Sequence, residues 1–227
     1  MNNVLISVEN LSLRFPNHQV LSNLSFTVKR GDFLGVIGEN GVGKTTLVRL
    51  ILRQLRPSAG KIVLKKGLRI GYVPQFRNID VEYPLSVKDF VSLNYTGIKL
   101  PWLSKKERAR VDEVMGKVGL TQIADRPLGL ASGGEKQKAY LAQALLKHPD
   151  LLILDESTAS LDPNTKQELL DVVKRLNQEM GLTILFVSHD MQMVQKYPDY
   201  FLWLQRDHYR MGAVSELRED SKGELHV

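Results

Sequence analysis

Residues 38–46, GENGVGKTT, constrain the fold of this chain more than any other segment. They follow GDFLGVIG, which predicts a buried strand, and they run into KTTLVRLILRQL, which predicts a helix. The segment matches G-x-x-x-x-G-K-[ST] in full. A strand, a glycine-rich loop and a helix in this order form a phosphate-binding loop, because the loop N–H groups and the helix N-terminus point at the same anion. A glycine-rich turn that only happens to precede a helix is the alternative, and the flanking elements argue against it.

The side chains of this loop predict a nucleotide that is held together with Mg²⁺. Lys44 can place its positive charge on the outer phosphates, and Thr45 can offer its hydroxyl to the metal. The residues that we expect to contact the nucleotide are Gly38, Glu39, Asn40, Gly41, Val42, Gly43, Lys44, Thr45 and Thr46.

Two further apolar segments end in polar residues that suit phosphate chemistry. LLILDE predicts a buried strand with Asp155 at its carboxyl end, the edge at which parallel sheets bind ligands. Asp155 would bind Mg²⁺ and Glu156 would polarise the attacking water, although by itself this pair would suggest a solvated acidic turn. LTILFVSHD repeats the pattern, and His189 would donate to the terminal phosphate, although a single histidine at a strand end is more often structural.

The remaining segments predict an α/β core with a helical insertion. Residues 4–15 and 20–28 predict strands joined by the turn PNHQ, and residues 60–75 predict one or two more strands. Residues 84–128 have a helical pattern broken by prolines. A helix is expected over NTKQELLDVVKRLNQEM, and two short strands are expected in the tail from about residue 201. A chain of 227 residues suits one large domain, or one domain with a small subdomain.

Composition and charge narrow the classes of protein. The chain has no cysteine, which excludes disulfides and thiolate metal sites. The net charge of +6 is spread along the sequence and indicates no particular partner. No apolar run is long enough to cross a bilayer, and the N-terminus does not have the pattern of a signal peptide. We therefore expect a cytoplasmic protein that serves any membrane from outside the lipid.

A second glycine-containing loop lies about ninety residues beyond the first, in LASGGEKQKAYLAQALLKHP at residues 130–149. Ser132, Gly133 and Gly134 precede a predicted helix, but no lysine accompanies them, so they suit the far side of a nucleotide that another chain holds. With this loop the chain resembles the ATP-binding cassette (ABC) ATPase family over roughly residues 4–215. In that family two cassettes pack head to tail, with each ATP between one phosphate loop and the signature loop of the other cassette.

The resemblance implies the fold, the cofactors and the assembly. It implies an α/β protein with a P-loop NTPase core, an N-terminal antiparallel β subdomain and a helical subdomain. Residues 1–227 would be a single ABC ATPase domain, with the helical signature subdomain, about residues 76–145, inserted in the RecA-like core. ATP and Mg²⁺ are the expected cofactors, and a homodimer is expected in the ATP-bound state.

The resemblance also assigns roles to individual residues. Phe15 matches the aromatic residue that stacks on adenine, although by its pattern it could equally be a core phenylalanine. Gln75 in YVPQ matches the Q-loop glutamine, which approaches Mg²⁺, and STASLD matches the D-loop, with Ser160 and Asp162. Lys44, Glu156 and His189, the switch histidine, are the expected catalytic residues. The expected metal ligands are Thr45, Gln75 and Asp155.

The sequence departs from the usual family pattern at four positions. In the signature, Ala131 replaces leucine and Glu135 replaces glutamine, while the contact-making Ser-Gly-Gly is intact. Lys138 replaces an arginine, which keeps the charge but loses the planar fork. Ser157 replaces the proline that commonly follows the catalytic glutamate, and we expect a looser turn there. None of these changes removes a reacting group.

Three classes of function are compatible with such an ATPase: a transporter subunit, a nucleic-acid or ribosome-associated ABC ATPase, and a soluble phosphotransferase. The third has no use for the Ser-Gly-Gly loop, and the second usually brings long coiled coils or a second cassette. We favour a transporter subunit, peripheral on the inner face of the cell membrane, with integral permease subunits and no nucleic acid as partner. Exposed apolar residues would form the docking groove unless they pack internally; the candidates are Phe76, Val81, Tyr83 and Leu85.

One segment favours a class of cargo. LRIGYVPQFRNIDVEYPLSVKDFV looks like the corresponding region of the ATPase subunits of zinc and manganese importers. The resemblance implies uptake of a divalent transition metal, with an extracytoplasmic solute-binding protein as a further partner, while other small solutes stay open. The chain itself predicts no site for a transported metal, because its five histidines are scattered.

Overall fold

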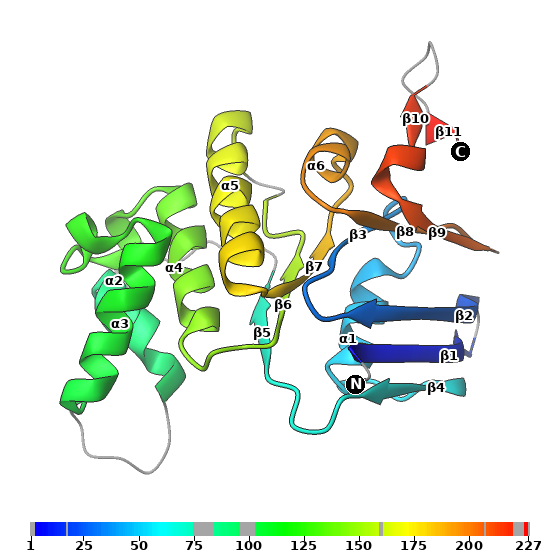
Figure 1. Cartoon of the computed structure of the whole chain (residues 1–227), viewed down its shortest axis with the longest axis horizontal. Coiled ribbons are helices and arrows are strands. Elements are labelled where there is room, and N and C mark those ends of the chain that lie inside the picture. Colours follow the sequence, from blue (N-terminus) through cyan, green and yellow to red (C-terminus); the bar gives the residue numbers. More distant parts are fainter. Residues whose placement is uncertain are drawn as a thin grey trace.

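A six-stranded sheet forms the centre of the computed structural model, which describes residues 3–16, 18–74, 84–95, 103–158, 161–206, 208–219 and 225–226 (Figure 1). Five neighbouring strands of this sheet are parallel, and the sixth, at one edge, pairs antiparallel with its neighbour. Parallel strands are covered on both faces, which explains their continuous Leu, Ile and Val runs. In sheet order the strands are β5 (Ile70–Val73), β6 (Leu151–Asp155), β7 (Thr183–Val187), β3 (Phe33–Ile37), β8 (Tyr200–Leu204) and β9 (Tyr209–Ala213).

The two faces of this sheet pack against different layers. Successive side chains of a strand point to opposite faces. Leu152 and Leu154 therefore join a hydrophobic cluster with the helices α4 (Gly133–Leu145), α5 (Pro163–Met180) and α6 (Met191–Lys196). Leu151 and Ile153 join a second cluster with helix α1 (Lys44–Ile51) and the N-terminal strands.

The N-terminal strands form a separate antiparallel sheet in the order β2 (His18–Lys29), β1 (Val4–Phe15) and β4 (Ala59–Leu64). The two strands predicted at the N-terminus are thus confirmed. The segment 60–75 contains two strands in different sheets, β4 here and β5 in the central sheet. The chain turns between them at Gly67, whose φ of 74° lies in the left-handed region that glycine adopts readily.

Helix α1 is shorter than its sequence pattern predicts, because it ends at Ile51 instead of continuing to Leu55. Arg53 has a φ of 58°, and the N–H of Gln54 donates to the carbonyl of Arg49 at 2.8 Å. This is the geometry of a helix C-terminus closed by a left-handed residue. The apolar pattern alone does not reveal that residue.

A group of helices lies at one side of the molecule (Figure 1). It consists of α2 (Val87–Ser92), α3 (Lys105–Val118) and α4, with short 3₁₀ turns at Leu93–Tyr95, Thr121–Ile123 and Leu128–Leu130. Ser86, Ser104 and Ser132 cap the three helices, since each accepts a backbone N–H at the helix start. The apolar residues of this helical group belong to the same cluster as one face of the central sheet, so the helices share its core. The boundary predicted near residue 76 lies outside the described residues.

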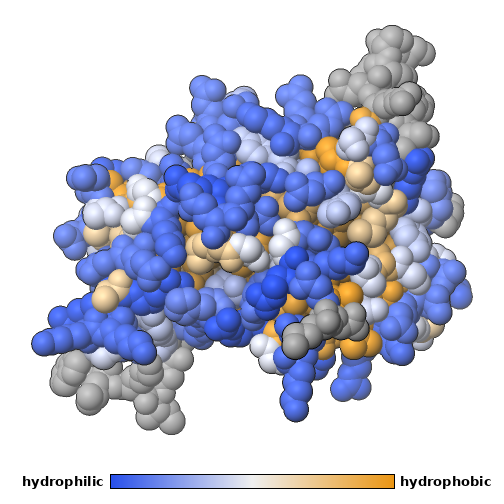
Figure 2. Space-filling view, in the orientation of Figure 1, coloured by the Kyte–Doolittle hydropathy of each residue, from blue (hydrophilic) through white to orange (hydrophobic). Residues whose placement is uncertain are grey.

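The C-terminal region contains the predicted pair of short strands, β8 and β9. Its first strand, β8, pairs in parallel with β3 and is part of the central sheet. After β9 come a 3₁₀ turn, Val214–Glu216, and a small pair of strands, β10 (Arg218–Glu219) and β11 (Leu225–His226). Within the described ranges, no helix has the length and apolar character needed to span a membrane. Hydrophilic residues cover most of the helical group on the face shown in Figure 2, and apolar surface gathers mainly on the other half.

Arg110 ties two helices of the helical group together, and its replacement should destabilise the protein. The side chain is buried on α3 and donates to the carbonyls of Leu145 at 2.9 Å and Leu146 at 3.4 Å, at the end of α4. In Arg110→Met both carbonyls lose the guanidinium donor, although Leu145 keeps the N–H of His148, and the ion pair with Glu113 is lost. We therefore expect the free energy of unfolding in urea to fall by about 1–3 kcal/mol. The exposed Arg108→Met on the same helix is the control. Equal effects of the two variants would contradict the bonding role of Arg110.

Candidate nucleotide-binding site

The predicted phosphate loop lies between β3 and α1. Gly38, Gly41 and Gly43 have φ values of 148°, 82° and 110°. A Cβ atom at Gly38 would meet the carbonyl oxygen of Leu204, and one at Gly43 would lie 3.0 Å from side-chain atoms of Val20 and Leu21. Glycine is therefore favoured at Gly38 and Gly43 by both the backbone and the neighbours, and at Gly41 by the backbone alone. Because the residue before α1 is a glycine, no side chain caps the first N–H groups of the helix, and they are open to an anion.

Lys44 lies inside this loop. Its Nζ atom donates to the carbonyls of Gly38 at 2.8 Å and Glu39 at 2.9 Å, and the side chain is 4% exposed. The same atom lies 3.7 Å from Oε1 of Glu156. The ammonium group therefore connects the phosphate loop to the carboxyl end of β6, although 112 residues separate Lys44 from Glu156.

Asp155 is the last residue of β6, and its carboxylate is almost fully buried. It accepts hydrogen bonds from Thr45 Oγ1 at 3.3 Å and from the hydroxyl of Tyr72 at 3.2 Å. Burial raises the pKa of Asp155, and the adjacent Glu156 adds to this rise, while the two hydrogen bonds oppose it. A buried carboxylate beside a hydroxyl is a set of hard oxygen donors, and a divalent cation would offset the cost of its negative charge. These residues therefore fit Mg²⁺.

Tyr72 is a site residue that the sequence reasoning missed. It lies on β5, three positions before the predicted Q-loop glutamine, and reaches Asp155 from the neighbouring strand. The only signal in the sequence is its place in GYVPQ, beside Gln75, which itself lies outside the described residues.

Glu156 sits at a sharp turn directly after β6. Its φ is 48°, and its N–H donates to the carbonyl of Val187 on β7 at 3.1 Å. This left-handed residue interrupts the alternation of the strand, as expected for two adjacent carboxylates that serve one site. Ser157, which we expected to loosen the turn, is completely buried, so packing constrains the chain where the family commonly has a proline.

Two aromatic side chains predicted at the site are accessible. Phe15 is 39% exposed at the end of β1, and its ring centroid lies 5.7 Å from that of His18. The alternative of a core phenylalanine is therefore wrong. His189 is exposed just beyond β7, and the preceding Ser188 is held by its N–H bond to the carbonyl of Val36 on β3, at 3.1 Å.

The signature loop begins helix α4. Ser132 Oγ accepts the N–H of Glu135 at 3.2 Å, and the Glu135 carboxylate accepts the N–H of Ser132 at 2.7 Å. Glu135, one of the departures from the family pattern, thus completes a capping box, and Arg126 lies 3.3 Å from the same carboxylate. Ser132 and Gly133 stay exposed at the surface, while Gly134 is buried.

The structure brings some of the predicted residues together and leaves others apart. Lys44, Thr45, Asp155 and Glu156 are linked by the contacts given above. Among the described residues no hydrogen bond or ion pair links Ser132 to the phosphate loop, and Figure 1 shows α4 and α1 on opposite sides of β5 and β6. Asp162 accepts the N–H groups of Asn164 and Thr165, both at 3.1 Å, at the start of α5. Ser160 lies outside the described residues.

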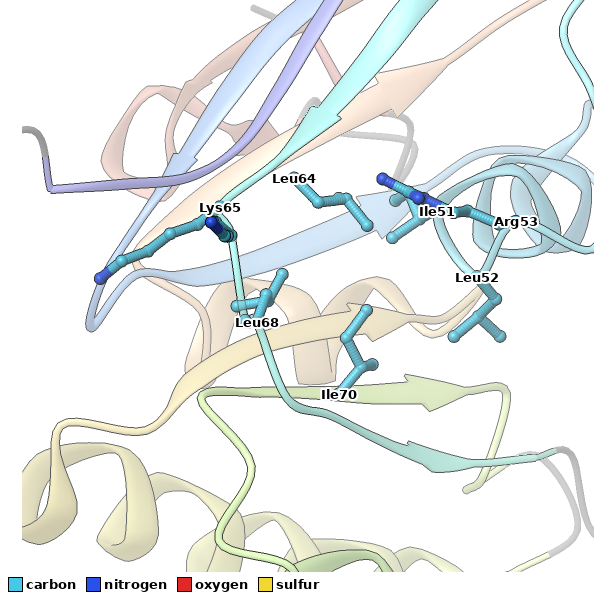
Figure 3. A pocket seen from close by; sticks show the side chains of 9 residues that line it. Ile51, Leu52, Arg53, Leu64, Lys65, Leu68 and Ile70 are labelled. Atoms are coloured by element: carbon cyan, nitrogen blue, oxygen red, sulfur yellow. The ribbon is translucent and has the colours of Figure 1, made fainter.

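A hollow of about 590 Å³ lies at the other end of α1 (Figure 3). It opens between the helix C-terminus and the connection from β4 to β5, so it is remote from Lys44 at the helix start and is not the phosphate site. Apolar side chains, of which Ile51 is buried and the others are half-buried, and three basic residues surround it: Ile51, Leu52, Arg53, Leu64, Lys65, Lys66, Gly67, Leu68 and Ile70.

Comparison with known proteins agrees with this geometry. The family model described as ABC transporter matches residues 21–159. The zinc import ATP-binding protein ZnuC of Yersinia pestis is 37% identical over 203 residues, which cover 89% of this chain and 77% of that protein. The chain belongs to the ABC transporter family. The predicted ABC ATPase fold and the interpretation as an ATP-hydrolysing transporter subunit are thereby confirmed.

The matches to two further relatives of this ABC ATPase cover a larger share of the relative's length. The probable metal transport system ATP-binding protein of Thermotoga maritima is 35% identical over 221 residues, which cover 96% of this chain and 89% of that protein. The solved structure of cbiO1 from Clostridium perfringens, part of the ABC transporter complex cbiONQ, has a TM-score of 0.83 and 29% identity. That match covers 95% of this chain and 90% of cbiO1. Of the three classes considered from the sequence, the transporter subunit is the one that these findings favour.

Proposed function

We propose that this ABC ATPase powers the uptake of a divalent transition metal, zinc or manganese. The observation that carries the proposal is the 37% identity to ZnuC over 89% of the chain. The relative from Thermotoga maritima, whose name refers to metal transport, supports the same class of cargo. The metal is cargo for other subunits, since the described residues contain no group of three or more His, Cys, Asp or Glu side chains that could hold one.

The nucleotide is held by the phosphate loop and by Phe15. The N–H groups of residues 38–46 surround the phosphates, Lys44 contributes its charge, and the accessible ring of Phe15 stacks on the base. Thr45 and Asp155, together with Gln75, would hold Mg²⁺. When bound, the metal ion offsets the negative charge of the phosphate oxygens.

Hydrolysis uses residues at the carboxyl ends of β6 and β7. Glu156 accepts a hydrogen bond from a water molecule and orients it toward the γ-phosphate. The water oxygen bonds to the γ-phosphorus as the bond between that phosphorus and the ADP oxygen breaks, and the proton of the water passes to Glu156. Lys44 and His189 stabilise the developing charge on the phosphoryl oxygens. Inorganic phosphate and ADP are the products.

The complete site requires two copies of the chain. Ser132 and Gly133 are exposed and have no described contact with the phosphate loop of their own chain, which supports a head-to-tail homodimer in the ATP-bound state. In that dimer Ser132, Gly133, Gly134 and Asp162 face the nucleotide that the other copy holds. Closure of the dimer moves the helical groups and drives permease subunits at the inner face of the membrane. An extracytoplasmic solute-binding protein delivers the metal.

Cellular metal content tests this function. A strain that lacks the protein is rescued with the parent chain or with Glu156→Gln under metal limitation, and zinc, manganese and iron are measured by elemental analysis. We expect one of zinc and manganese to fall in the deletion strain and to recover only with the parent chain. Unchanged contents of both metals, or recovery with Glu156→Gln, would contradict metal uptake driven by hydrolysis.

Tyr72 should support Mg²⁺ binding, because its hydroxyl orients the Asp155 carboxylate. Removal of such a supporting hydrogen bond commonly costs tenfold or more in metal affinity. In Tyr72→Phe we therefore expect about tenfold weaker binding of ATP in the presence of Mg²⁺, with no change when Mg²⁺ is chelated, by titration calorimetry. Tyr200 is exposed, and Tyr200→Phe is the control. Equal losses with and without Mg²⁺ would show that Tyr72 acts on the nucleotide or on the fold instead.

A further inference from the structure

Helix α5 carries a lysine whose contact has no part in the chemistry described so far. Nζ of Lys166 donates to Oδ2 of Asp190 at 2.6 Å, the shortest ion pair among the described residues. The two side chains are 14% and 22% exposed, so the pair is shielded from solvent more than an ordinary surface pair. Because water screens such a shielded pair less, its charged hydrogen bond is stronger than one at an open surface.

Asp190 follows the switch histidine and holds its loop in place. Oδ1 of Asp190 accepts the N–H of Met193 and thereby caps α6, and the N–H of Asp190 donates to Ser188 Oγ at 3.0 Å. Burial works to raise the pKa of Asp190, but the bonds from Lys166 and from the Met193 N–H keep it below its ordinary value. Both residues that flank His189 are therefore anchored, and Lys166 is the anchor that comes from another helix.

The other side of α5 contacts the signature helix at the same turn. A Cβ atom at Gly134 would meet the side chain of Thr165, the residue next to Lys166, so α4 and α5 approach closely there. One turn further on, Lys138 of α4 pairs with Glu168 of α5 at 3.2 Å. The first two turns of α5 thus join the signature loop, which serves the partner's nucleotide, to the loop of His189, which serves the chain's own nucleotide.

We propose that Lys166 is a positioning residue for hydrolysis, which holds the His189 loop against α5 so that His189 and the signature loop move together when the dimer closes. The inference rests on the proposed role of His189 at the γ-phosphate. Lys166 acts through Asp190 and does not touch the substrate. Small errors in the placement of a reacting group are costly, and a shift of about 1 Å can reduce a rate by about a hundredfold.

A second lysine on the same helix provides a matched control. Lys174 pairs with Asp199 at 2.8 Å, two turns beyond Lys166. The N–H of Asp199 donates to the carbonyl of Phe33 at the start of β3, whereas the phosphate loop follows the other end of that strand. We expect Lys166→Met to lower kcat about tenfold or more, with ATP affinity of the single chain within about twofold of the parent. Lys174→Met should leave kcat near the parent value. Lys166→Arg should restore most of the rate, because it keeps the charge and the donor. Rates are measured well below the thermal unfolding transition of each variant.

The His189→Ala background separates positioning from general damage. If Lys166 acts through His189, Lys166→Met adds little to the loss in His189→Ala, because the group it positions is already absent. Equal losses in both backgrounds, or a kcat of Lys166→Met equal to that of Lys174→Met, would overturn the proposal. His189→Ala with the parent rate would instead overturn the role of His189 itself. Should Lys166→Met fail to fold, Lys166→Gln repeats the test with a neutral polar side chain.

Discussion

Glu156→Gln should bind ATP as the parent does and should slow its hydrolysis by about a thousandfold, within the range by which a general base accelerates such reactions. The substitution keeps the shape of a side chain that lies 3.7 Å from Lys44 Nζ. It removes the carboxylate that we propose polarises the water, while the phosphate loop and the proposed ligands of Mg²⁺ are unchanged. In the proposed cycle closure needs ATP and reopening needs hydrolysis, so the variant should accumulate as an ATP-bound dimer. Turnover assays and size-exclusion chromatography with and without ATP measure the two effects.

A second Glu→Gln substitution, on the N-terminal sheet, is the control for a general effect of losing a carboxylate. Glu9→Gln removes an exposed partner of Lys61 on the N-terminal sheet, and we expect turnover and monomer–dimer behaviour like those of the parent. If Glu156→Gln hydrolyses ATP at the parent rate, Glu156 is not the base. If it is slow but stays monomeric with ATP, the assignment of the base stands and the link between ATP and dimer closure fails.

Ser132→Arg should abolish ATP-dependent dimerisation and reduce turnover about a hundredfold or more, while each single chain still binds ATP within about twofold of the parent. Ser132 is exposed and has no described hydrogen bond to its own phosphate loop, so we expect a large side chain there to obstruct only the surface proposed to meet the other copy. Sedimentation with ATP in the Glu156→Gln background reports the dimer, and a fluorescent ATP analogue reports binding by the single chain.

The second capping box of the helical group supplies the control for this variant. Ser104 caps α3 with Glu107 as Ser132 caps α4 with Glu135, so Ser104→Arg loses the same kind of cap, worth about 1 kcal/mol, at a different surface. We expect Ser104→Arg to form the dimer with ATP. Failure of both variants would point to the lost cap, and dimerisation of Ser132→Arg would contradict the head-to-tail arrangement.

Much of the site could be predicted because its signals are local. The loop at residues 38–46 needs glycines, a lysine and a following helix, all within one short segment. Asp155, Glu156 and His189 each follow a run of apolar residues that forms a strand of the central sheet. Parallel strands bind ligands at their carboxyl ends, so the motifs had to meet at one edge. The sequence also determined the two β strands at the N-terminus, through alternation, and the helical character of the insertion, through its helical pattern broken by prolines.

Only the tertiary structure decided which distant residues share a contact. Tyr72 and Asp155 are 83 residues apart, and Lys166 and Asp190 are 24 apart, and no local pattern marks either pair. The tertiary structure also placed β8, the first of the two short strands predicted in the tail, next to β3 in the central sheet. A residue's neighbours in sequence determine its local conformation, whereas strand order and helix packing depend on how the whole apolar surface is buried. For that reason the sequence determined the chemistry of the phosphate loop, and the structure determined which side chains support it.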